Sequence, residues 1–453
     1  MKRLELRVPV KLTDRLLSAI DSADGVERVA FGLVSHSSSP GRELLLLREV
    51  LPVRPDSYLA PGLHGAKWSG QFTVEVLNRA ARQTLGIVIL HEHRLGRPVR
   101  LSPDDRESGA EQLGAFGRLI PERPHATVVV GADSAAALVS FQGELLQPEA
   151  FCLRLLGGNI EDRASTPHVE ASEEREAFAR QLLLVGGEGQ RRLGGTTVAV
   201  VGLCGGGSHA IQQLAHLGVG RILGIDDDVC SESNRSRMVG VTEQAVRERW
   251  PKTRVSAEVV NRIGLGSEFV PVQSRVPSNE AVAAILSADV VLGCVDNLHA
   301  RADLQTLAWR HLIPYVDIGL RIEEGYRENR ALARSWIGGQ IMTLVPGSAC
   351  MWCMGYLSDT KLRSELGGRE RSYLGQTPGT GQVVSLNGVL ASQATTEVLR
   401  LLTGFAEVER GTRRLSFNGV SGSLEHWSLE RSAACSHCEN ELAAGSPVWR
   451  SAG

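Results

Sequence analysis

Apolar runs of strand length alternate with helical patterns along the first third of the chain. Five runs are typical of strands: residues 26–34, 44–53, 87–93, 126–132 and 135–143. The turn-rich segment SHSSSPGR separates the first two, and a helical pattern over residues 74–86 precedes the third. This pattern predicts a front domain that mixes strands and helices.

From residue 196 the order becomes strand, Gly-rich turn, helix, strand. Strands are expected at 196–203, 221–228, 288–297 and 314–320, with helices at 209–218 and 300–311. Such alternation predicts a parallel sheet wrapped by helices. Ligands of these sheets bind at the carboxyl ends of the strands.

Between the two regions, at residues 152–167, the pattern weakens into polar, Gly-containing sequence, and a charged helical stretch follows at 171–186. We therefore predict a front domain over 1–158, a linker over 159–171 and a second domain over 172–453. The length of 453 residues agrees with two domains, because single cores stop growing at about 250–300 residues.

The composition of the chain mainly argues against certain classes of partner, location and scaffold. Lys and Arg total 49 against 51 Asp and Glu, and a net charge of -2 argues against a nucleic-acid or membrane-surface partner. The chain has no apolar run of spanning length, and its start lacks the apolar core of a secretory signal, so a cytoplasmic protein is expected. Eight cysteines are too sparse for a disulfide scaffold.

A glycine-rich turn follows the first strand of the second domain. GLCGGGSHA places Gly202, Gly205, Gly206 and Gly207 before a helix, where glycines allow close approach of phosphates and helix N–H groups attract anions. Cys204 stands at the middle glycine of the dinucleotide-binding pattern, so an ordinary dinucleotide site is not expected. A turn that serves only helix–sheet packing is the alternative.

Polar residues crowd beyond the next strands. The second strand ends in IDDD, and an acidic residue about 20 positions past the glycines typically binds a ribose hydroxyl. The residues that follow it are Asp228, Ser233, Asn234, Arg235 and Arg237. Lys252 is one of only five lysines against 44 arginines, and its compact ammonium suits a phosphate. Asp296 and Asn297 end another strand, where a carboxylate is suited to Mg²⁺.

Over residues 172–430 these signals, in this order, resemble the adenylation core of the ThiF/MoeB/ubiquitin-activating superfamily. The resemblance implies ATP-dependent adenylation of the C-terminal carboxylate of a ubiquitin-like protein. It places Gly205 beside the phosphates and gives the ribose to Asp226, the SNxxR positions to Ser233, Asn234 and Arg237, the phosphate role to Lys252 and the Mg²⁺ role to Asp296. The neighbouring Gly202, Gly207, Asp228 and Asn297 are also expected at the nucleotide site. FARQLLL is similar to the family's RYxRQ opening, which implies a homodimer in which Arg180 reaches into the partner's site.

Four cysteines form two CxxC pairs, Cys350/Cys353 and Cys435/Cys438. Four thiolates at such spacing make a closed, tetrahedral zinc site, and two unrelated exposed pairs are the alternative. The superfamily carries this pairing in the same places, so the resemblance implies a structural zinc that pins the C-terminal tail to the core.

Many relatives carry an acyl-accepting cysteine in the crossover segment before the helix expected at 387–402, and RSYLGQTPGTGQVVS has none here. Cys204, Cys230 and Cys294 stand by strand ends and are interpreted as small packing residues. Two hypotheses remain. Either the enzyme stops at the acyl-adenylate, or a hydroxyl accepts the acyl group as an oxyester: Ser372, Thr377 or Thr380.

A second constellation lies in the front domain. His91 and His93 stand two apart on a predicted strand, so both point to one side and suit one metal ion. A carboxylate from Asp104 or Asp105 would complete three protein ligands and leave a fourth position for water. A charged strand-end loop is the alternative.

The order of helix, HxH and SxxD resembles the JAB/JAMM (MPN) metalloprotease family, whose motif is Glu…HxHP…SxxD. The roles implied are zinc ligation by His91, His93 and Asp105, with Asp104 as the runner-up, oxyanion stabilisation by Ser102, and general-base action by Glu27. Glu27 stands two residues before the usual position, which Val29 occupies, and strand parity keeps both on one face. An inactive, carrier-docking domain is the alternative.

The leading prediction is an α/β protein in which a JAB/MPN-like α+β domain precedes a Rossmann-like adenylation domain with a structural zinc. It would use ATP, Mg²⁺ and zinc to activate and process one ubiquitin-like protein in a bacterial conjugation pathway, with a conjugating enzyme as a further partner. The enzyme alternative is sulfur-carrier activation for cofactor or tRNA thiolation. The other alternative is a non-catalytic carrier-binding scaffold.

Overall fold

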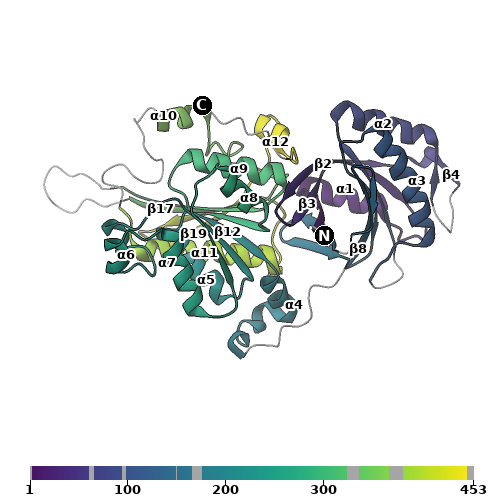
Figure 1. Ribbon diagram of the computed structural model, residues 1–453. Helices are drawn as coiled ribbons and strands as arrows, with labels where there is room; N and C mark the ends of the chain where they lie inside the picture. The colour runs from purple at the N-terminus through teal and green to yellow at the C-terminus, as the bar shows by residue number, and fades with distance from the viewer. Residues whose placement is uncertain are drawn as a thin grey trace. The chain divides into compact units, whose positions relative to one another are not determined.

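A computed structural model describes residues 3–60, 66–93, 98–148, 150–165, 176–323, 336–366 and 381–445. The chain divides into two compact units, coloured along the sequence in Figure 1. The first comprises Met1–His168 with Trp309–Leu312 and Asn440–Gly453, and the second comprises Val169–Ala308 and Ile313–Glu439.

The first unit is built on a nine-stranded mixed sheet in the order β11-β10-β1-β3-β2-β6-β7-β8-β9. Its strands are β1 (Arg3–Val8), β2 (Val29–Ser39), β3 (Arg42–Pro52), β6 (Gly86–Glu92), β7 (His125–Val130), β8 (Ala135–Phe141), β9 (Glu144–Leu146), β10 (Phe151–Leu156) and β11 (Ile160–Ala164). A short 3-10 turn (Pro55–Ser57) and the small ribbon of β4 (Tyr58–Ala60) and β5 (Lys67–Trp68) lie outside this sheet.

Helices cover both faces of the first sheet. α1 (Val10–Ile20) packs Leu12, Leu16 and Ile20 on one face, while α2 (Gly70–Gln83) and α3 (Pro103–Leu119) pack on the other. The central strand β6 therefore buries alternate residues in both apolar layers, which explains why its sequence is continuously apolar rather than alternating.

The second unit is built on an eight-stranded sheet in the order β14-β13-β12-β15-β16-β17-β18-β19. The strands β12 (Thr197–Val201), β13 (Arg221–Ile225), β14 (Glu268–Val272), β15 (Val290–Gly293) and β16 (Tyr315–Glu323) are mutually parallel. β17 (Trp336–Leu344), β18 (Arg413–Asn418) and β19 (Ser423–Ser428) extend it antiparallel. The predicted parallel sheet is confirmed.

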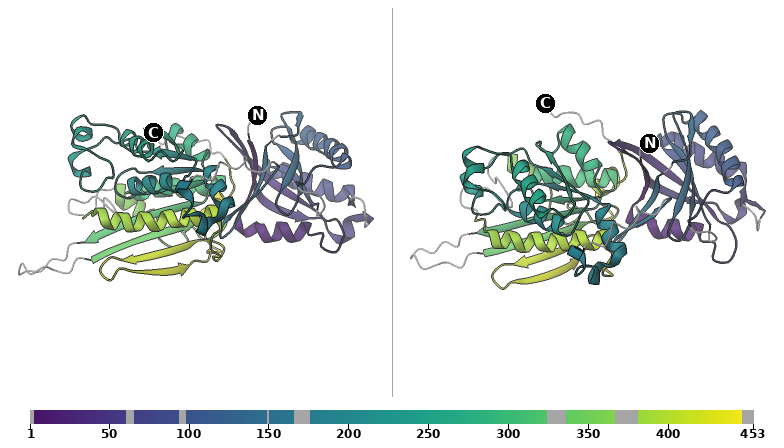
Figure 2. Two further views of the ribbon diagram at one scale, coloured as in Figure 1. Left: turned by 90° about the horizontal axis from the view of Figure 1, so that it is seen from below. Right: turned by 60° about the horizontal axis from the view of Figure 1, so that its bottom comes forward.

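Helices also cover both faces of the second sheet. On one face lie α5 (Gly205–His216), α7 (Lys252–Ile263) and α11 (Val384–Thr403), and on the other lie α8 (Asn279–Leu286) and α9 (Leu298–His311) (Figure 1). Figure 2 shows α11, in yellow-green, running along the strands. The remaining helices are α4 (Leu182–Gly194), α6 (Glu243–Arg247), α10 (Asp359–Leu366), α12 (Ser436–Glu441) and two 3-10 turns, Glu176–Phe178 and Glu232–Asn234.

Three local predictions were wrong. β2 continues through most of the turn-rich segment to Ser39, because Ser35, Ser37 and Ser39 are buried on alternate positions of a strand. Of the helix expected at 171–186, residues 171–175 lie outside the described residues; in the rest, the helix begins only at Leu182, and Gly186, with φ +66°, kinks it. Residues 151–164 form β10 and β11, so the predicted linker overlaps a strand; the domain boundaries themselves stay a prediction.

Within the described ranges, no helix combines the length and the apolar character that crossing a bilayer requires.

Candidate functional site

The glycine turn lies between β12 and α5 and is sterically closed to side chains. Gly202 has φ +87°, and a Cβ built there would lie 2.6 Å from the Cys294 carbonyl oxygen. A Cβ on Gly207 would lie 1.8 Å from the Gly202 carbonyl oxygen. The turn therefore requires glycine at both positions. No side chain caps the start of α5, so its first N–H groups are left for an anion.

A buried lysine lies between two carboxylates where β13 ends. The Lys252 ammonium is 2.6 Å from Asp228 Oδ2 and 3.5 Å from Asp226 Oδ1. Asp226 also accepts hydrogen bonds from the N–H groups of Leu203 (2.7 Å) and Asp228 (2.9 Å), which join it to the glycine turn. Burial alone would lower the pKa of Lys252, but the two carboxylates hold it above its usual value. The ammonium is therefore charged at neutral pH.

The segment after Asp228 folds back toward the glycine turn. Asn234 is buried, accepts a hydrogen bond from the Ser231 N–H (2.8 Å), and its amide nitrogen lies 3.4 Å from Cys204 Sγ. The exposed Ser233 hydroxyl lies 3.1 Å from Ser231 Oγ. Arg237 is half-buried and donates to the Ser233 carbonyl at 2.6 Å. The SNxxR residues thus form one small structure beside the turn.

Asp296 and Asn297 follow β15, the strand on the other side of β12. Asp296 is exposed, and Asn297 accepts a hydrogen bond from the Ala300 N–H at 2.7 Å, which caps the start of α9. Because β12, β13 and β15 are adjacent and parallel, the turn, Asp226 and Asp296 all lie at one edge of the sheet.

A fully buried ion pair anchors the Asp296 loop, and the sequence patterns did not indicate it. The Arg301 Nε lies 3.1 Å from both carboxylate oxygens of Asp317, and its NH2 group donates to the Val295 carbonyl at 2.7 Å. Tyr315 donates its hydroxyl to Asp317 at 2.6 Å. Arg301 thereby fixes the backbone immediately before Asp296.

Arg180 is exposed in the turn before α4. Among the described residues, no hydrogen bond or ion pair joins it to the nucleotide-site side chains named above. Its proposed action on a partner subunit stays a prediction.

The four predicted zinc cysteines come together. Cys350 Sγ lies 3.6 Å from the sulfurs of both Cys353 and Cys435, and Cys353 Sγ lies 3.5 Å from that of Cys438. All four sulfurs fall within 4.8 Å of one another. Zinc–sulfur bonds of about 2.3 Å in a tetrahedron give edges of about 3.8 Å, so the donor set fits zinc.

Two of the remaining cysteines of the second unit, Cys230 and Cys294, are poor acyl acceptors. Burial raises the pKa of the Cys230 and Cys294 thiols, which disfavours the reactive thiolate. Cys204 Sγ lies beside the Asn234 amide. Ser372, Thr377 and Thr380 lie outside the described residues.

In the first unit the histidine motif forms a compact cluster at the end of β6. The Nε2 atoms of His91 and His93 are 3.2 Å apart, and Asp105 Oδ1 lies 3.0 Å from His91 Nε2. Asp105 Oδ2 is 3.7 Å from His93 Nε2, and Glu27 Oε1 is 3.7 Å from His91 Nε2. Zinc–nitrogen bonds of about 2.0–2.1 Å predict distances of about 3.4 Å between donor atoms. One donor atom each from Glu27, His91 and His93 lies within 4.8 Å of the others, so this set is compatible with one metal ion.

Asp104 and Asp105 differ in their hydrogen bonds at the start of α3. Ser102 is the N-cap of α3, accepts from the Asp105 N–H, and donates its hydroxyl to Asp105 Oδ2 at 2.7 Å. Burial alone would raise the pKa of Asp105, but hydrogen bonds from His91 and Ser102 hold it well below its usual range. Asp104 is exposed one position earlier. Of the two aspartates, Asp105 is therefore the one that lies beside the histidines.

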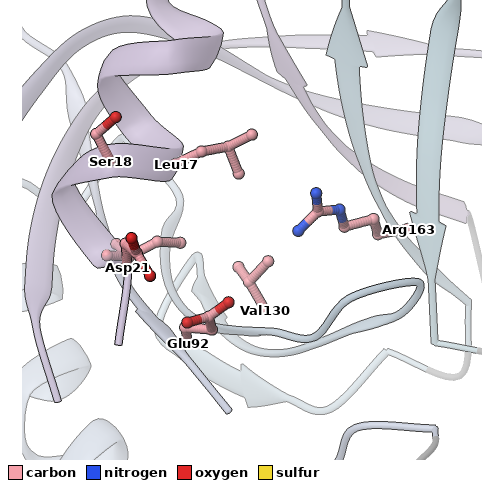
Figure 3. Close-up of a pocket in the computed structure, with 7 residues that line it drawn as sticks. Leu17, Ser18, Asp21, Glu92, Val130 and Arg163 are labelled. Carbon is pink, nitrogen blue, oxygen red and sulfur yellow. The ribbon is translucent and has the colours of Figure 1, made fainter. Parts of the chain in front are cut away.

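The loop that carries Glu27 is held by the residue between the two histidines. Glu92 points away from the cluster and accepts hydrogen bonds from the Ser22 N–H (2.9 Å) and hydroxyl (2.6 Å), directly after α1. Arg28 holds the same loop through Asp24. Glu92 also lines a cavity of about 260 Å³. Figure 3 shows Glu92 with other residues that line this cavity, among them Leu17, Asp21, Val130 and Arg163.

Comparison with known proteins shows the family to which this chain belongs. The second unit combines a parallel sheet of the kind that binds nucleotides, a glycine turn, and four cysteines whose spacing fits zinc. These features define its class of protein, and residues 178–439 match the ThiF family. The chain belongs to the ThiF family.

Three named relatives are each similar to part of this chain. The sulfur carrier protein ThiS adenylyltransferase of Escherichia coli K12 is 26% identical over 58% of this chain and 94% of its own length. The SAMP-activating enzyme E1 of Haloferax volcanii is 32% identical over 40% of this chain and 61% of its own length. The molybdopterin-synthase adenylyltransferase of Escherichia coli K12 is 26% identical over 59% of this chain and 98% of its own length.

Proposed function

We propose that the second unit uses ATP and Mg²⁺ to adenylate the C-terminal carboxylate of a ubiquitin-like or sulfur-carrier protein. The observation that carries this proposal is the charged Lys252, buried between Asp226 and Asp228 beside a glycine turn with uncapped helix N–H groups. A positive side chain and free N–H donors at one edge of a parallel sheet suit a triphosphate. The names of the three relatives point to the same reaction.

In the proposed reaction a carboxylate oxygen forms a bond to the α-phosphorus of ATP. The bond between that phosphorus and the bridging oxygen breaks, and pyrophosphate leaves with the electron pair. Lys252 and Arg237 offset the growing negative charge, and Asp226 holds the ribose. Asp296 and Asn297 would hold Mg²⁺, which neutralises phosphate charge when bound.

ATP–pyrophosphate exchange stimulated by a small carrier ending in glycine tests this activity. Asp296→Ala should lower exchange at least about 100-fold, because the Asp296 carboxylate would hold the metal ion that stabilises the charge of the transition state. Glu258→Gln on the exposed surface of α7 is the matched control and should retain wild-type exchange. Wild-type protein that neither binds ATP nor exchanges pyrophosphate would favour the non-catalytic scaffold.

The fate of the activated carrier has two candidate answers, and the relatives' names fit sulfur transfer at least as well as conjugation. Conjugation predicts carrier attached to an amine, with or without a covalent enzyme intermediate. Sulfur transfer predicts a thiocarboxylate formed only when a sulfide source is supplied. Mass spectrometry of the carrier after incubation with ATP, with and without sulfide, separates them. Hydroxylamine lability of any enzyme adduct tests the oxyester hypothesis.

For the first unit we propose a JAB/JAMM-like zinc hydrolase that cuts bonds made to the same carrier terminus. His91, His93 and Asp105 would hold the zinc, which when bound makes water a better nucleophile. Glu27 would take the proton from that water, and Ser102 would stabilise the oxyanion. His91→Ala should abolish cleavage of a carrier fusion and spare exchange. Loss of both activities in a folded variant would contradict the assignment of cleavage and adenylation to two separate sites.

We also propose a structural zinc at the cysteine quartet, a domain division near residues 158–172, and a homodimer formed through the second unit. The quartet's sulfur spacing supports the first and the compact units support the second. Arg180 would complete the active site of the partner subunit.

A further inference from the structure

An asparagine on α11 lies beside the glycine turn without a hydrogen-bond partner. Asn387 is 5% exposed, and its side-chain amide nitrogen is buried and has no partner among the described residues. A Cβ built on Gly205 would lie 2.5 Å from that nitrogen and 2.9 Å from the Asn387 carboxamide carbon. Asn387 therefore occupies the space that a side chain at Gly205 would need.

The same place holds unsatisfied backbone donors. Gly205, Gly206 and Gly207 form the first turn of α5, and the first intrahelical bond there is from the Ser208 N–H to the Cys204 carbonyl at 2.9 Å. The N–H groups of the three glycines precede that bond, and no side chain caps them. The Asn387 amide thus adds a neutral donor beside a group of orphan donors, all of which favour an anionic oxygen.

We propose that Asn387 donates a hydrogen bond to an anionic oxygen at the reacting centre. This oxygen belongs either to a phosphoryl group of the nucleotide or to the carboxylate that attacks it. The inference rests on the proposed adenylation and adds to it a residue that none of the nucleotide-binding motifs includes. Buried amide donors almost always have acceptors, and the Asn387 amide has none among the described residues, so we expect a ligand to supply one.

Asn387 differs from a packing residue in what its replacement should do. If the amide served only to fill space against Gly205, replacing Asn387 by leucine, which has a similar volume, would leave ligand binding unchanged. Replacing it by aspartate would then mainly change the stability of the fold. If the amide donates to an anion, leucine removes the donor and aspartate places a negative charge where the anion binds. Aspartate should then be the more damaging change to ligand binding, although its shape is closer to asparagine.

The matched control lies on the same helix. Thr395 is 2% exposed and its hydroxyl also has no partner among the described residues, but it stands eight positions along α11, about 12 Å from Asn387. Thr395→Val removes a buried orphan hydroxyl without changing shape. It reports the effect of altering a buried polar group on α11 away from the glycine turn.

The experiment measures binding to the full chain by calorimetry, with two probes. One is ATP with Mg²⁺, and the other is glycyl-sulfamoyl adenosine, a stable analogue of an acyl-adenylate. Asn387→Leu should weaken binding roughly 10- to 100-fold, as for loss of a hydrogen bond to a charged group, and Asn387→Asp should weaken it further. Thr395→Val should bind as wild type. Weaker binding of ATP, with or without weaker binding of the analogue, assigns the oxygen to a phosphoryl group, because the analogue carries a sulfamoyl group in place of the α-phosphate and lacks the other two phosphates. Weaker binding of the analogue alone assigns the oxygen to the acyl group.

Unchanged affinity for both probes in folded Asn387→Leu and Asn387→Asp would overturn the inference while leaving adenylation intact. Wild-type protein that binds neither probe would instead overturn the proposed function, and this inference with it. Thermal unfolding of each variant shows whether it is folded. Should the leucine variant fail to fold, the aspartate variant, which keeps the side-chain shape, decides the question.

Discussion

Replacing Asp317 by asparagine tests how the Asp296 loop is anchored. The side chains of Arg301 and Asp317 are 1% and 0% exposed, so both charges have left water. Asp317→Asn removes the negative charge and keeps the shape. The guanidinium then stays buried with neutral acceptors alone, among them the Val295 and Ile318 carbonyls, which accept from its NH2 group at 2.7 and 2.9 Å.

The expected cost follows from that geometry. Breaking a buried pair by neutralising one partner typically costs about 3–5 kcal/mol, because the other charge is left uncompensated. The asparagine oxygen can still accept from Arg301 and Tyr315, so we expect the lower end, about 3 kcal/mol. That free energy corresponds to a change of roughly 150-fold in the unfolding equilibrium and to a midpoint shift of about 1 M urea. The double variant Arg301→Met with Asp317→Leu should recover most of the loss.

Urea unfolding followed by circular dichroism gives the stability, and ATP–pyrophosphate exchange gives the function. Glu258→Gln breaks the exposed pair with Arg254 and should shift stability by less than about 0.5 kcal/mol. The double variant should remain stable yet exchange slowly, because Arg301 no longer fixes the Val295 carbonyl before Asp296. A loss below about 1 kcal/mol in Asp317→Asn, or full exchange in the double variant, would refute the anchoring argument.

Three further outcomes are expected. Wild-type protein should hold about two zinc ions per chain by atomic absorption, and Cys438→Ser and His91→Ala should each hold about one; two ions in either variant would show that the altered residue is not a ligand. Ser102→Ala should lose about 1 kcal/mol from the α3 cap and weaken zinc binding at least about 10-fold in a chelator competition, whereas an unchanged zinc affinity would separate the cap from the metal site. Inactive Arg180→Ala and Lys252→Ala proteins, mixed in equal amounts and allowed to exchange subunits, should regain about a quarter of wild-type exchange; no recovery would place Arg180 outside the partner's site.

Much of the fold followed from local pattern. Four of the five parallel strands of the second unit were predictable because each is a short apolar run. β14 was missed because only one of its five residues, Val272, is buried. β10 and β11 were missed because Arg154 and Asp162 pair across them at 2.7 Å, so buried strand positions carry charged residues. The start of α4 was missed because the charged residues before Leu182 have helical spacing, whereas Glu176–Phe178 forms a 3-10 turn.

Some residues of the candidate sites were also predictable from local sequence rules, and others were not. The histidine cluster was predictable because the spacing of two residues on a strand and an N-capping serine are local rules. Ser-x-x-Asp also signals a capping box, which points to Asp105 over Asp104. Arg301, Asp317 and Asn387 escaped prediction because their roles depend on contacts between separate elements. No spacing rule in the sequence brings α11 next to the glycine turn.

The cysteine quartet closes the chain on itself around α11. Cys353 and Cys435 bracket a stretch of the chain that includes this helix, and a cross-link that closes a loop of roughly 80 residues removes about 4–5 kcal/mol of unfolded-chain entropy. If zinc forms that cross-link, metal supply would govern how firmly α11 is held against the glycine turn. A cell starved of zinc would then lose carrier activation through a remote tether, with every nucleotide-binding side chain still present.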